Sequence, residues 1–349
     1  MRGEYKVPGG KLVAVDFDVR DGALANVRLS GDFFLEPEDA LGRIERAVEG
    51  ASPDTSVGAL TQQVAAGLAD DDVPIGFDAR AVGIAVRRAL GKSSTWADHV
   101  FELIHDGPRL PAMHMALDQV YAEALAARRR GPTLRVWQWG ASAVIIGSYQ
   151  SLRSEVDLEA ARRHGVSVVR RISGGGAMFV EPGNTITYSL VVPGSLVDGL
   201  SFEESYEFLD RWVVAALRDL GIAAVYQPIN DISSPEGKIA GAAQRRLADG
   251  TVLHHVTMAY DIDPAKMVEV LRIGREKLSD KGTASAVKRV DPLRSQTGLS
   301  RDAVIDALVT SFARRNRLEW SAPRPEELSA AEHLVRTKFG TASWTARIP

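Results

Sequence analysis

Hydrophobic residues occupy every second position over residues 12–19, a pattern that predicts a β-strand with one buried face. The dipeptide Asp21-Gly22 is typical of hairpin turns, and apolar residues return over 24–29, so we expect a β-hairpin. A two-stranded ribbon is only marginally stable by itself. Apolar residues at helical spacing over 41–48 and 82–90 predict two helices that cover this hairpin. The first segment therefore predicts a small α+β unit.

The rest of the chain mixes helical and strand patterns. Apolar stripes at helical spacing predict helices over residues 113–125 and 300–312. A capping-box pattern at Ser201 and Glu204 and the glycine Gly221 predict a helix over 201–221. Several short apolar or alternating runs predict strands. These runs cover residues 134–139, 143–147, 167–171, 185–192 and 252–260.

A polar run of small residues without periodicity, residues 91–95, separates the two segments. We place the linker there, since domain boundaries fall in such stretches. The chain has 349 residues, enough for two cores. The expected organisation is a small α+β domain over residues 1–92 and a larger, mixed-sheet α+β domain over residues 98–349.

Composition narrows the classes of function. Hydrophobic residues make up 45% of the chain and charged residues 25%, and the net charge of -3 gives no support for a nucleic-acid or anionic-membrane partner. The apolar runs are far too short to span a bilayer, and the start of the chain lacks the apolar stretch of a signal sequence, so a cytoplasmic location is expected. The chain contains no cysteine, which excludes disulfides, thiolate metal sites and cysteine nucleophiles.

The most informative motif is residues 170–179, Arg-Arg-Ile-Ser-Gly-Gly-Gly-Ala-Met-Phe, which follow a predicted strand. Consecutive glycines let backbone N–H groups approach a phosphate, and arginine supplies planar, permanently charged donors for the same anion. A flexible turn with solvated arginines explains a glycine triplet about as well. The spacing fits neither a dinucleotide fingerprint nor a Walker A loop, and the apolar, β-rich sequence after Gly176 predicts that the loop joins two strands.

Three further features carry candidate chemistry. Lys238 follows a turn at residues 233–237 and begins a run of small residues, so it either points into a pocket or is an ordinary exposed lysine, the commoner case. The pair His254-His255 lies on a predicted strand, where neighbouring side chains face opposite sides of the sheet, which disfavours a shared metal. A basic run over residues 272–289 is either a solvated surface or a mobile loop over the active site that helps to dock an acidic acceptor.

In this order, the segments resemble the lipoate-protein ligase A family of the biotin/lipoate protein ligase superfamily. Residues 170–179 are similar to its Arg-Arg-x-Ser-Gly-Gly-Gly-Ala motif, residues 230–244 to its Asn-Asp and Lys-x-x-Gly-x-Ala segment, and His254-His255 to its paired-histidine strand. The resemblance extends from about Met113 to residues 285–289. The N-terminal segment, from residue 9 to 41, resembles the accessory domain that follows the catalytic domain in many bacterial members and would here precede it.

The resemblance implies an enzyme that activates lipoate with ATP to lipoyl-AMP, releases pyrophosphate and transfers the lipoyl group to a lysine. The implied cofactor is Mg²⁺, and the implied acceptors are the lipoyl domains of 2-oxo acid dehydrogenase complexes and the glycine-cleavage H protein. Lys238 is implied as the catalytic residue, in contact with both the lipoate carboxylate and the nucleotide phosphate. The implied ATP contacts are Arg171, Gly176, Ala177, Met178, Phe179 and Lys238. The implied lipoate contacts are Arg170, Ser173, Gly174, Gly175, Lys238, Gly241 and His255, and Asp231 is the implied metal ligand.

Three alternatives remain, two of them enzymes and one a non-catalytic binding protein. Octanoyl and lipoyl transferases share the expected fold, but their better-known forms pass the acyl group through a cysteine thioester, which this chain cannot form. An octanoate- or biotin-type acyl ligase shares the chemistry, yet the Gly-Arg-Gly-Arg-x-Gly loop of biotin ligases is missing. A non-catalytic carrier or sensor that binds lipoate or lipoyl domains is disfavoured, because both Arg171 and Lys238 are present.

Overall fold

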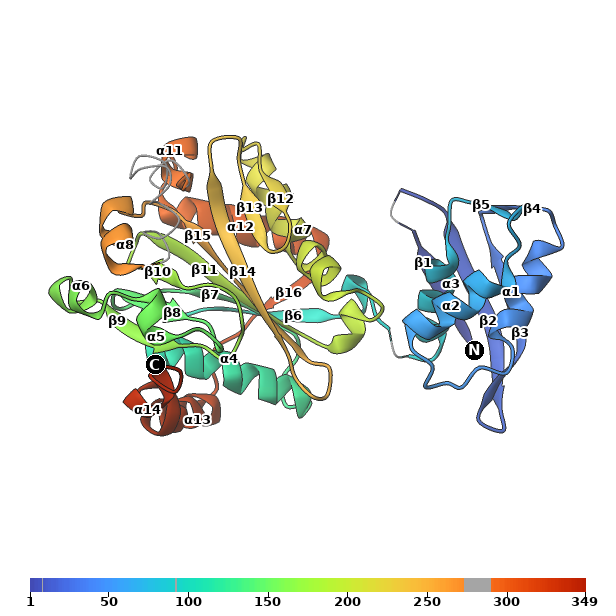
Figure 1. The fold of residues 1–349 in the computed structure, drawn as a ribbon, viewed down its shortest axis with the longest axis horizontal. Coiled ribbons are helices and arrows are strands. Elements are labelled where there is room, and N and C mark those ends of the chain that lie inside the picture. The colour runs from blue at the N-terminus through green and yellow to red at the C-terminus, as the bar shows by residue number, and fades with distance from the viewer. Residues whose placement is uncertain (8, 92, 273–289) are drawn as a thin grey trace. The chain divides into compact units, whose positions relative to one another are not determined.

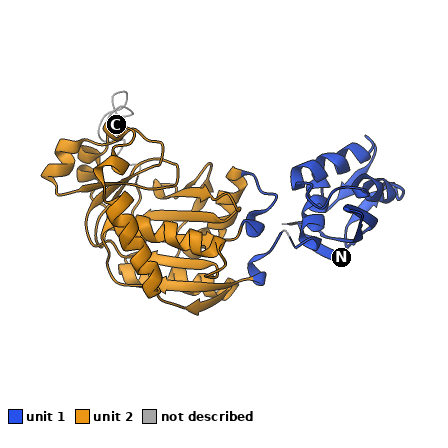
Figure 2. Cartoon of the chain, turned by 90° about the horizontal axis from the view of Figure 1, so that it is seen from below, with its two compact units in different colours: residues 1–98, 194–201 blue, residues 99–193, 202–349 orange. Residues whose placement is uncertain are grey.

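The computed structural model describes residues 1–7, 9–91, 93–272 and 290–349, which form two compact units (Figure 2). Unit 1 consists of Met1–Asp98 together with Gly194–Ser201, and unit 2 of His99–Pro193 with Phe202–Pro349. Each unit has a hydrophobic core of its own. The expected linker at residues 91–95 lies within the sequence range of unit 1, close to where unit 2 begins.

Unit 1 is built on the predicted hairpin. Strand β2 (Leu12–Arg20) pairs with β3 (Ala23–Gly31) and, on its other side, with β1 (Arg2–Lys6), which the sequence pattern did not predict. The alternating residues Val13, Val15 and Phe17 are buried, as their period-2 spacing predicts. The two predicted helices, α1 (Ala40–Val48) and α3 (Ala79–Ala89), are present. A third helix, α2 (Val57–Gly67), completes the cover, and β4 (Phe34–Glu36) pairs with β5 (Val73–Ile75).

An eight-stranded mixed sheet forms the centre of unit 2 (Figure 1). Its strand order is β12-β13-β14-β15-β11-β7-β6-β16, antiparallel except that β6 is parallel to both β7 and β16. The prediction of an α+β fold with a mixed sheet is confirmed. The strands are β6 (Val100–His105), β7 (Thr133–Trp137), β11 (Thr185–Val192), β12 (Val225–Gln227), β13 (Asp231–Ser233), β14 (Lys238–Arg246), β15 (Val252–Ala259) and β16 (Arg317–Trp320).

A second, three-stranded sheet in unit 2 holds the glycine motif. Strand β8 (Ala143–Ile146) lies between β9 (Ser167–Arg170), to which it is parallel, and β10 (Met178–Val180), to which it is antiparallel. Residues 171–177 therefore join β9 to β10, as predicted. Apolar side chains of this sheet, among them Ile145 and Val169, share a core with the helix α4 (Pro111–Ala126).

Helices cover both faces of the large sheet. Neighbouring residues of a strand face opposite sides, and His255 of β15 contacts α4, whereas His254 contacts α7 (Phe202–Asp219). On the α7 side, Trp212 packs against Phe312 of α12 (Arg301–Arg315), their ring centroids 5.0 Å apart. The shorter helical segments are η1 (Trp96–Asp98), α5 (Leu152–Glu155), α6 (Leu158–Arg163), η2 (Gly194–Val197), α8 (Pro264–Val270), α11 (Leu293–Thr297), α13 (Pro325–Leu334), η3 (Val335–Phe339) and α14 (Ala342–Thr345).

Sequence spacing predicted the long helices well. The buried residues of α4 include Ala116, Leu117 and Tyr121, which belong to the predicted stripe. Helix α12 begins after Ser300, whose hydroxyl accepts a hydrogen bond from the Ala303 amide, the usual N-cap arrangement. Among the described residues, no helix has the length and apolarity required to cross a membrane.

Candidate active site

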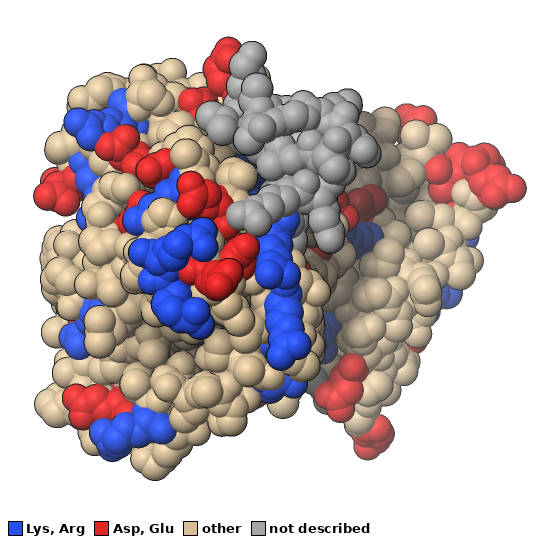
Figure 3. All heavy atoms as spheres, turned by 60° about the vertical axis from the view of Figure 1, so that its left-hand side comes forward, with Lys and Arg blue, Asp and Glu red and all other residues tan. Residues whose placement is uncertain are grey.

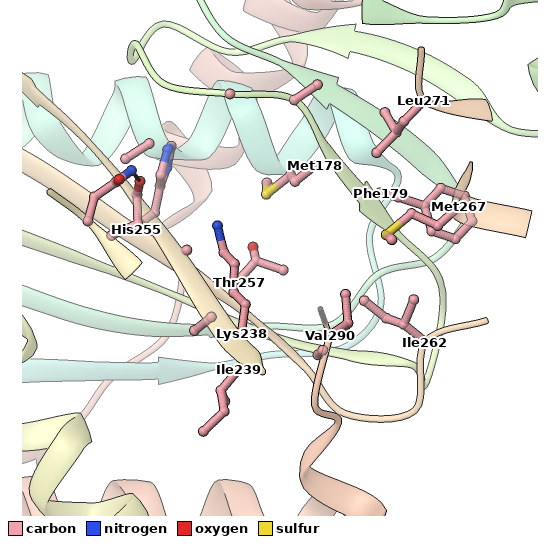
Figure 4. A pocket seen from close by; sticks show the side chains of 18 of the residues that line it. Met178, Phe179, Lys238, Ile239, His255, Thr257, Ile262, Met267, Leu271 and Val290 are labelled. Atoms are coloured by element: carbon pink, nitrogen blue, oxygen red, sulfur yellow. Dashed lines mark hydrogen bonds between the residues drawn. The ribbon is translucent and has the colours of Figure 1, made fainter. Parts of the chain in front are cut away.

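A cavity of about 290 Å³ lies between the two sheets of unit 2 (Figure 4). Its walls come from the glycine loop and β10, from β14 and β15, and from α8 and the residues that flank it. The tips of the Lys238 and Met178 side chains face each other across it, with His255 to one side and Phe179 and Met267 to the other (Figure 4). A cavity with one polar and one apolar side suits a ligand that combines charged and hydrocarbon groups.

Arg171 provides a buried positive charge at this cavity. Only 3% of the residue is exposed, and burial lowers the pKa of its guanidinium to about 10, so it stays protonated at neutral pH. In the described chain its hydrogen bonds go to neutral oxygens, including the carbonyls of Ile145 at 3.1 Å and Gly176 at 2.8 Å and the Ser173 hydroxyl at 3.0 Å. A buried cation without a carboxylate partner favours the binding of an anion.

The glycine loop adds backbone donors beside this charge. Arg171 also holds the Gly174 carbonyl, so the loop's carbonyl groups are turned toward the guanidinium. Gly175 has φ +83°, a left-handed conformation that glycine adopts without strain. Among the described residues, none of the amide groups of residues 174–177 donates a hydrogen bond. Free amide groups on successive residues form a nest that binds anions such as phosphate.

Lys238 stands at the first position of β14, as the turn before it predicts. Within that turn the Ser234 amide donates to the Gly237 carbonyl at 2.8 Å. The Lys238 ammonium is 2.7 Å from Asp231 Oδ1 on the neighbouring strand, and both side chains are partly exposed. A methyl group on Gly241 would lie 3.1 Å from the lysine Nζ atom, so glycine there leaves the ammonium room to lie over the strand.

The paired histidines have separate partners on the two faces of the sheet, as their adjacency predicts. His254 Nε2 is 2.6 Å from Asp210 Oδ1, on the side away from the cavity. His255 lines the cavity, with Nδ1 2.8 Å from Asp118 Oδ2 and Nε2 2.7 Å from Ser173 Oγ. Because a carboxylate accepts hydrogen bonds, the proton lies on Nδ1, and Nε2 accepts from the serine hydroxyl.

Asp118 joins this group to the core of unit 2. Its second oxygen accepts a hydrogen bond from the buried Arg135 guanidinium at 3.0 Å, and Arg135 also stacks on Trp137, 4.4 Å from the ring centroid. Arg135, Asp118, His255, Ser173 and Arg171 thus form one continuous buried chain of hydrogen bonds. Such a chain restricts the orientation of the guanidinium at the cavity.

We expect the stability of the protein to fall as the pH falls from 7 to 5. Burial lowers the pKa of His255 below its usual value, and burial beside Arg135 lowers that of His114 further. An unfolded histidine takes up its proton near pH 6.5, so below that pH the unfolded chain binds more protons and the free energy of unfolding decreases. The decrease approaches about 1.4 kcal/mol per pH unit for each histidine.

Urea unfolding at pH 5, 6 and 7 measures this effect. His255→Gln keeps a hydrogen-bonding side chain without the titration, so its stability should depend less on pH than that of the unmodified protein. Equal pH dependence in the two proteins would contradict the assignment of the proton uptake to His255.

The structure brings together most of the residues that the sequence singled out. Arg171, Gly176, Ala177, Met178, Phe179, Lys238, Gly241 and His255 all line the cavity. Asp231 contacts Lys238 at its edge. Ser173, Gly174 and Gly175 stand behind the lining: Ser173 and Gly174 are hydrogen-bonded to Arg171 or His255, and a methyl group on Gly175 would lie 3.0 Å from the Arg171 guanidinium. Arg170 is fully buried and outside the lining, with its guanidinium bonded to backbone carbonyls elsewhere.

Sequence reasoning missed several residues of the site. Asn230, Thr257, Ile262, Met267, Leu271 and Val290 also line the cavity. Thr257 follows His255 by two positions on the same strand, a period-2 signal that places both on one face. Asp118 carries a weaker signal: its i,i+4 spacing from His114 puts both polar groups on one face of α4, and both are buried.

The predicted basic run lies mostly outside the described residues, which end at 272 and resume at 290. In the part of the chain that is described, no group of three or more histidine or acidic side chains is arranged to hold a metal ion. On the side of unit 2 that carries α6 and α8, lysine and arginine side chains gather next to acidic ones (Figure 3). The visible part of this face therefore carries both signs of charge.

Comparison with known sequences identifies relatives over most of unit 2. Residues 110–313 match the family model of the lipoyl protein ligase A/B catalytic domain. An octanoyltransferase LipM of Symbiobacterium thermophilum is 30% identical over 275 residues, which cover 71% of this chain and 98% of that protein. Lipoate-protein ligase A subunit 1 of Thermoplasma acidophilum is 29% identical, with 69% of this chain and 94% of that protein covered.

Solved structures share the fold. A bipartite lipoate protein ligase of T. acidophilum, described with its E2 lipoyl domain, matches with a TM-score of 0.62 at 28% identity, over 72% of this chain and 97% of that chain. A lipoate-protein ligase A bound with ATP matches with a TM-score of 0.61 at 25% identity, over 72% and 99%. A T. acidophilum protein with bound lipoic acid matches with a TM-score of 0.59 at 25% identity, over 71% of this chain and 99% of that chain.

Proposed function

The chain belongs to the lipoyl protein ligase A/B catalytic family, and on this basis we propose that it is an ATP-dependent lipoate-protein ligase. The resemblance to lipoate-protein ligases that its motifs carry is confirmed by this membership. The observation that supports the ligase activity is the convergence of Arg171, the free amides of Gly176 and Ala177 and the Lys238 ammonium on one cavity. Those are the groups needed to hold two anions, a carboxylate and a phosphate, in contact.

The competing function within the family is octanoyl transfer, because relatives named as octanoyltransferases match the chain as well as those named as ligases do. A transfer that passes the acyl group through a thioester requires a cysteine. None of the 349 residues is a cysteine, so this route is closed to the chain. An ATP-dependent route needs no nucleophile from the protein, which is why we favour the ligase.

The proposed reaction has two steps. A carboxylate oxygen of lipoate attacks the α-phosphorus of ATP, pyrophosphate leaves, and lipoyl-AMP forms. The amine of an acceptor lysine then attacks the acyl carbonyl, and AMP leaves. In the first step, Lys238 and Arg171 would offset the repulsion between the carboxylate and the phosphate, and each preorganised donor of this kind typically stabilises the transition state by about 3 kcal/mol.

The remaining predicted contacts fit this scheme. Gly176, Ala177, Met178 and Phe179 would bind the nucleotide along the loop and β10, and Gly241 and His255 would line the lipoate side. Ser173 and Gly174 would act through Arg171 and His255, to which they are hydrogen-bonded, and Gly175 would act through its close packing beside the Arg171 guanidinium. The lipoate contact of Arg170 stays a prediction from the sequence.

Mg²⁺ is the cofactor that the resemblance implies. The only carboxylate beside Lys238 among its described ion pairs is Asp231, which is partly exposed. Magnesium in nucleotide sites usually takes one or two carboxylates, with phosphate oxygens and water completing its shell. A single carboxylate therefore fits a nucleotide-bound ion, and we propose Asp231 as its protein ligand. When bound, the ion would neutralise phosphate charge.

The proposed acceptors are lipoyl domains, including that of the glycine-cleavage H protein. One related structure is described together with its E2 lipoyl domain, which supports this class of partner. Because the reaction consumes ATP, we place it in the cytoplasm. Unit 1 corresponds to residues that resemble the family's accessory domain, and we propose that it assists the transfer step.

Intact-mass analysis of an apo lipoyl domain tests the proposal. The domain is incubated with the protein, Mg²⁺ and ATP in three separate reactions, which contain lipoate, octanoate or biotin. A parallel set of reactions omits ATP. A lipoyl mass gain that requires ATP is expected. If the lipoyl domain instead gains an octanoyl mass from an octanoyl-loaded acyl carrier protein without ATP, the result would support the transferase. Tight lipoate binding without any mass gain would support a carrier or sensor.

Deleting residues 1–92 is expected to leave lipoyl-AMP formation within about threefold of the full chain, because the described residues that line the cavity all belong to unit 2, which has a core of its own. Lipoyl transfer should fall at least about tenfold, the effect of losing about 1.4 kcal/mol of productive docking. Pyrophosphate exchange measures the first step and intact mass the second, and a thermal melt establishes that the fragment is folded. Loss of both steps in a folded fragment would contradict the proposed division of labour.

A further inference from the structure

Arg170 connects two parts of unit 2 that lie far apart in the sequence. Its fully buried guanidinium donates to the carbonyls of Gly147 at 2.9 Å and Gln150 at 2.6 Å, in the turn after β8. It also donates to the carbonyls of Thr345 at 2.8 Å and Ile348 at 3.1 Å. These acceptors are all neutral, so the charged guanidinium of Arg170 holds two backbone segments together, the turn after β8 and residues 345–348.

The segment of residues 342–348 makes further contacts with the same turn. Arg347 donates to the Ser148 carbonyl at 2.5 Å and to its hydroxyl at 2.6 Å, and its guanidinium lies 4.1 Å from the centre of the Trp344 ring. The Trp344 indole N–H donates to the Arg170 carbonyl at 2.9 Å. The segment is therefore fixed to the turn and to the end of β9 by side chains and backbone together.

The same turn, residues 147–150, also contacts the glycine loop and supports it. The Ser148 amide donates to the Ser173 carbonyl at 2.8 Å, and the Arg171 amide donates to the Ile146 carbonyl at 3.0 Å. A methyl group on Gly147 would lie only 2.2 Å from the Gly175 carbonyl oxygen, which shows how closely turn and loop are packed. Contacts thus lead without a break from residues 342–348 to the loop with the free amide groups.

We infer that the segment of residues 342–348 positions the glycine loop for the nucleotide, with Arg170 and Arg347 as its positioning residues. The segment lies beyond residue 313, where the match to the family model ends. A glycine-rich loop loses much conformational entropy when it is ordered. A support that orders the loop before binding reduces the cost of ordering it around ATP. The nucleotide part of this inference rests on the proposed function.

The test is Arg347→Ala in the full chain. Arg347 is exposed, so the fold should survive, and a thermal melt verifies this. The KM for ATP is expected to rise about tenfold, which corresponds to the loss of one hydrogen bond from a charged donor. The kcat and the KM for lipoate should stay within about twofold, and amide hydrogen exchange should accelerate in peptides that cover residues 145–152 and 171–180.

Arg336→Ala is the matched control, because Arg336 is another exposed arginine in the same part of the chain. It should change neither the exchange nor the KM for ATP. If Arg347→Ala does not fold, Trp344→Phe removes the indole donor to Arg170 and retains an aromatic ring, and the same two results are expected.

Unchanged exchange in both peptides overturns the inference, whether or not the enzyme uses ATP. Faster exchange with an unchanged KM for ATP overturns it as well, because the loop would then move without any effect on the nucleotide. A folded wild-type protein that neither binds nor consumes ATP refutes the proposed function and the nucleotide part of the inference. The exchange data then still decide whether the segment orders the loop.

Discussion

Lys238→Ala is expected to reduce lipoyl-AMP formation on the order of 10²–10³-fold, close to the background rate. Unlike Arg171, Lys238 is not held by backbone carbonyls in the described structure, and its ammonium pairs with the Asp231 carboxylate at 2.7 Å. It can therefore turn toward an incoming carboxylate and phosphate. Lipoate-dependent exchange of pyrophosphate into ATP measures the effect directly.

The fold of this variant should be unchanged. The Lys238 side chain is 48% exposed, and an exposed ion pair of this kind contributes only about 0–1 kcal/mol to stability. Lys266→Ala is the comparison, because Lys266 also pairs with a carboxylate, Glu181, and lies near the cavity without lining it. Full pyrophosphate exchange in Lys238→Ala, or an equal loss in Lys266→Ala, would refute the role assigned to Lys238.

Gly147→Ala is expected to raise the KM for ATP on the order of 10- to 100-fold, with a loss of stability of about 1–3 kcal/mol. The added methyl group would lie 2.2 Å from the Gly175 carbonyl oxygen and 3.3 Å from the Gly174 carbonyl carbon. Both are backbone atoms, which cannot turn aside as the end of a side chain can. The loop must therefore move, and its amide groups and Arg171 would lose their present arrangement.

Gly107→Ala is the control for the general effect of replacing a glycine with alanine where no steric clash arises. Nothing lies within 4 Å of the position that its methyl group would take, so neither the KM for ATP nor the melting temperature should change appreciably. Steady-state kinetics with varied ATP and a thermal melt distinguish the two variants. A normal KM for ATP in folded Gly147→Ala would mean that close packing behind the loop does not determine nucleotide binding.

The sequence predicted those features whose signal is local. The hairpin of β2 and β3, the helices α4, α7 and α12, and the opposite orientation of His254 and His255 all follow from periodicity or from start and end signals within one segment. The sequence pattern did not predict several shorter elements. Strand β13 has three residues and the edge strand β16 has four, too few for a period-2 pattern to stand out.

The sequence by itself also determined which chemistry is available: a glycine loop with two arginines, a lysine after a turn, paired histidines and no cysteine. Only the tertiary structure decided how the two arginines divide their tasks. Arg171 points to the cavity, and Arg170 holds backbone of residues 147–150 and 345–348. Their partners lie up to 178 positions away in the chain. A local pattern shows that neighbouring strand residues face opposite sides of the sheet. It does not show which residues contact each side chain, because those contacts depend on long-range packing.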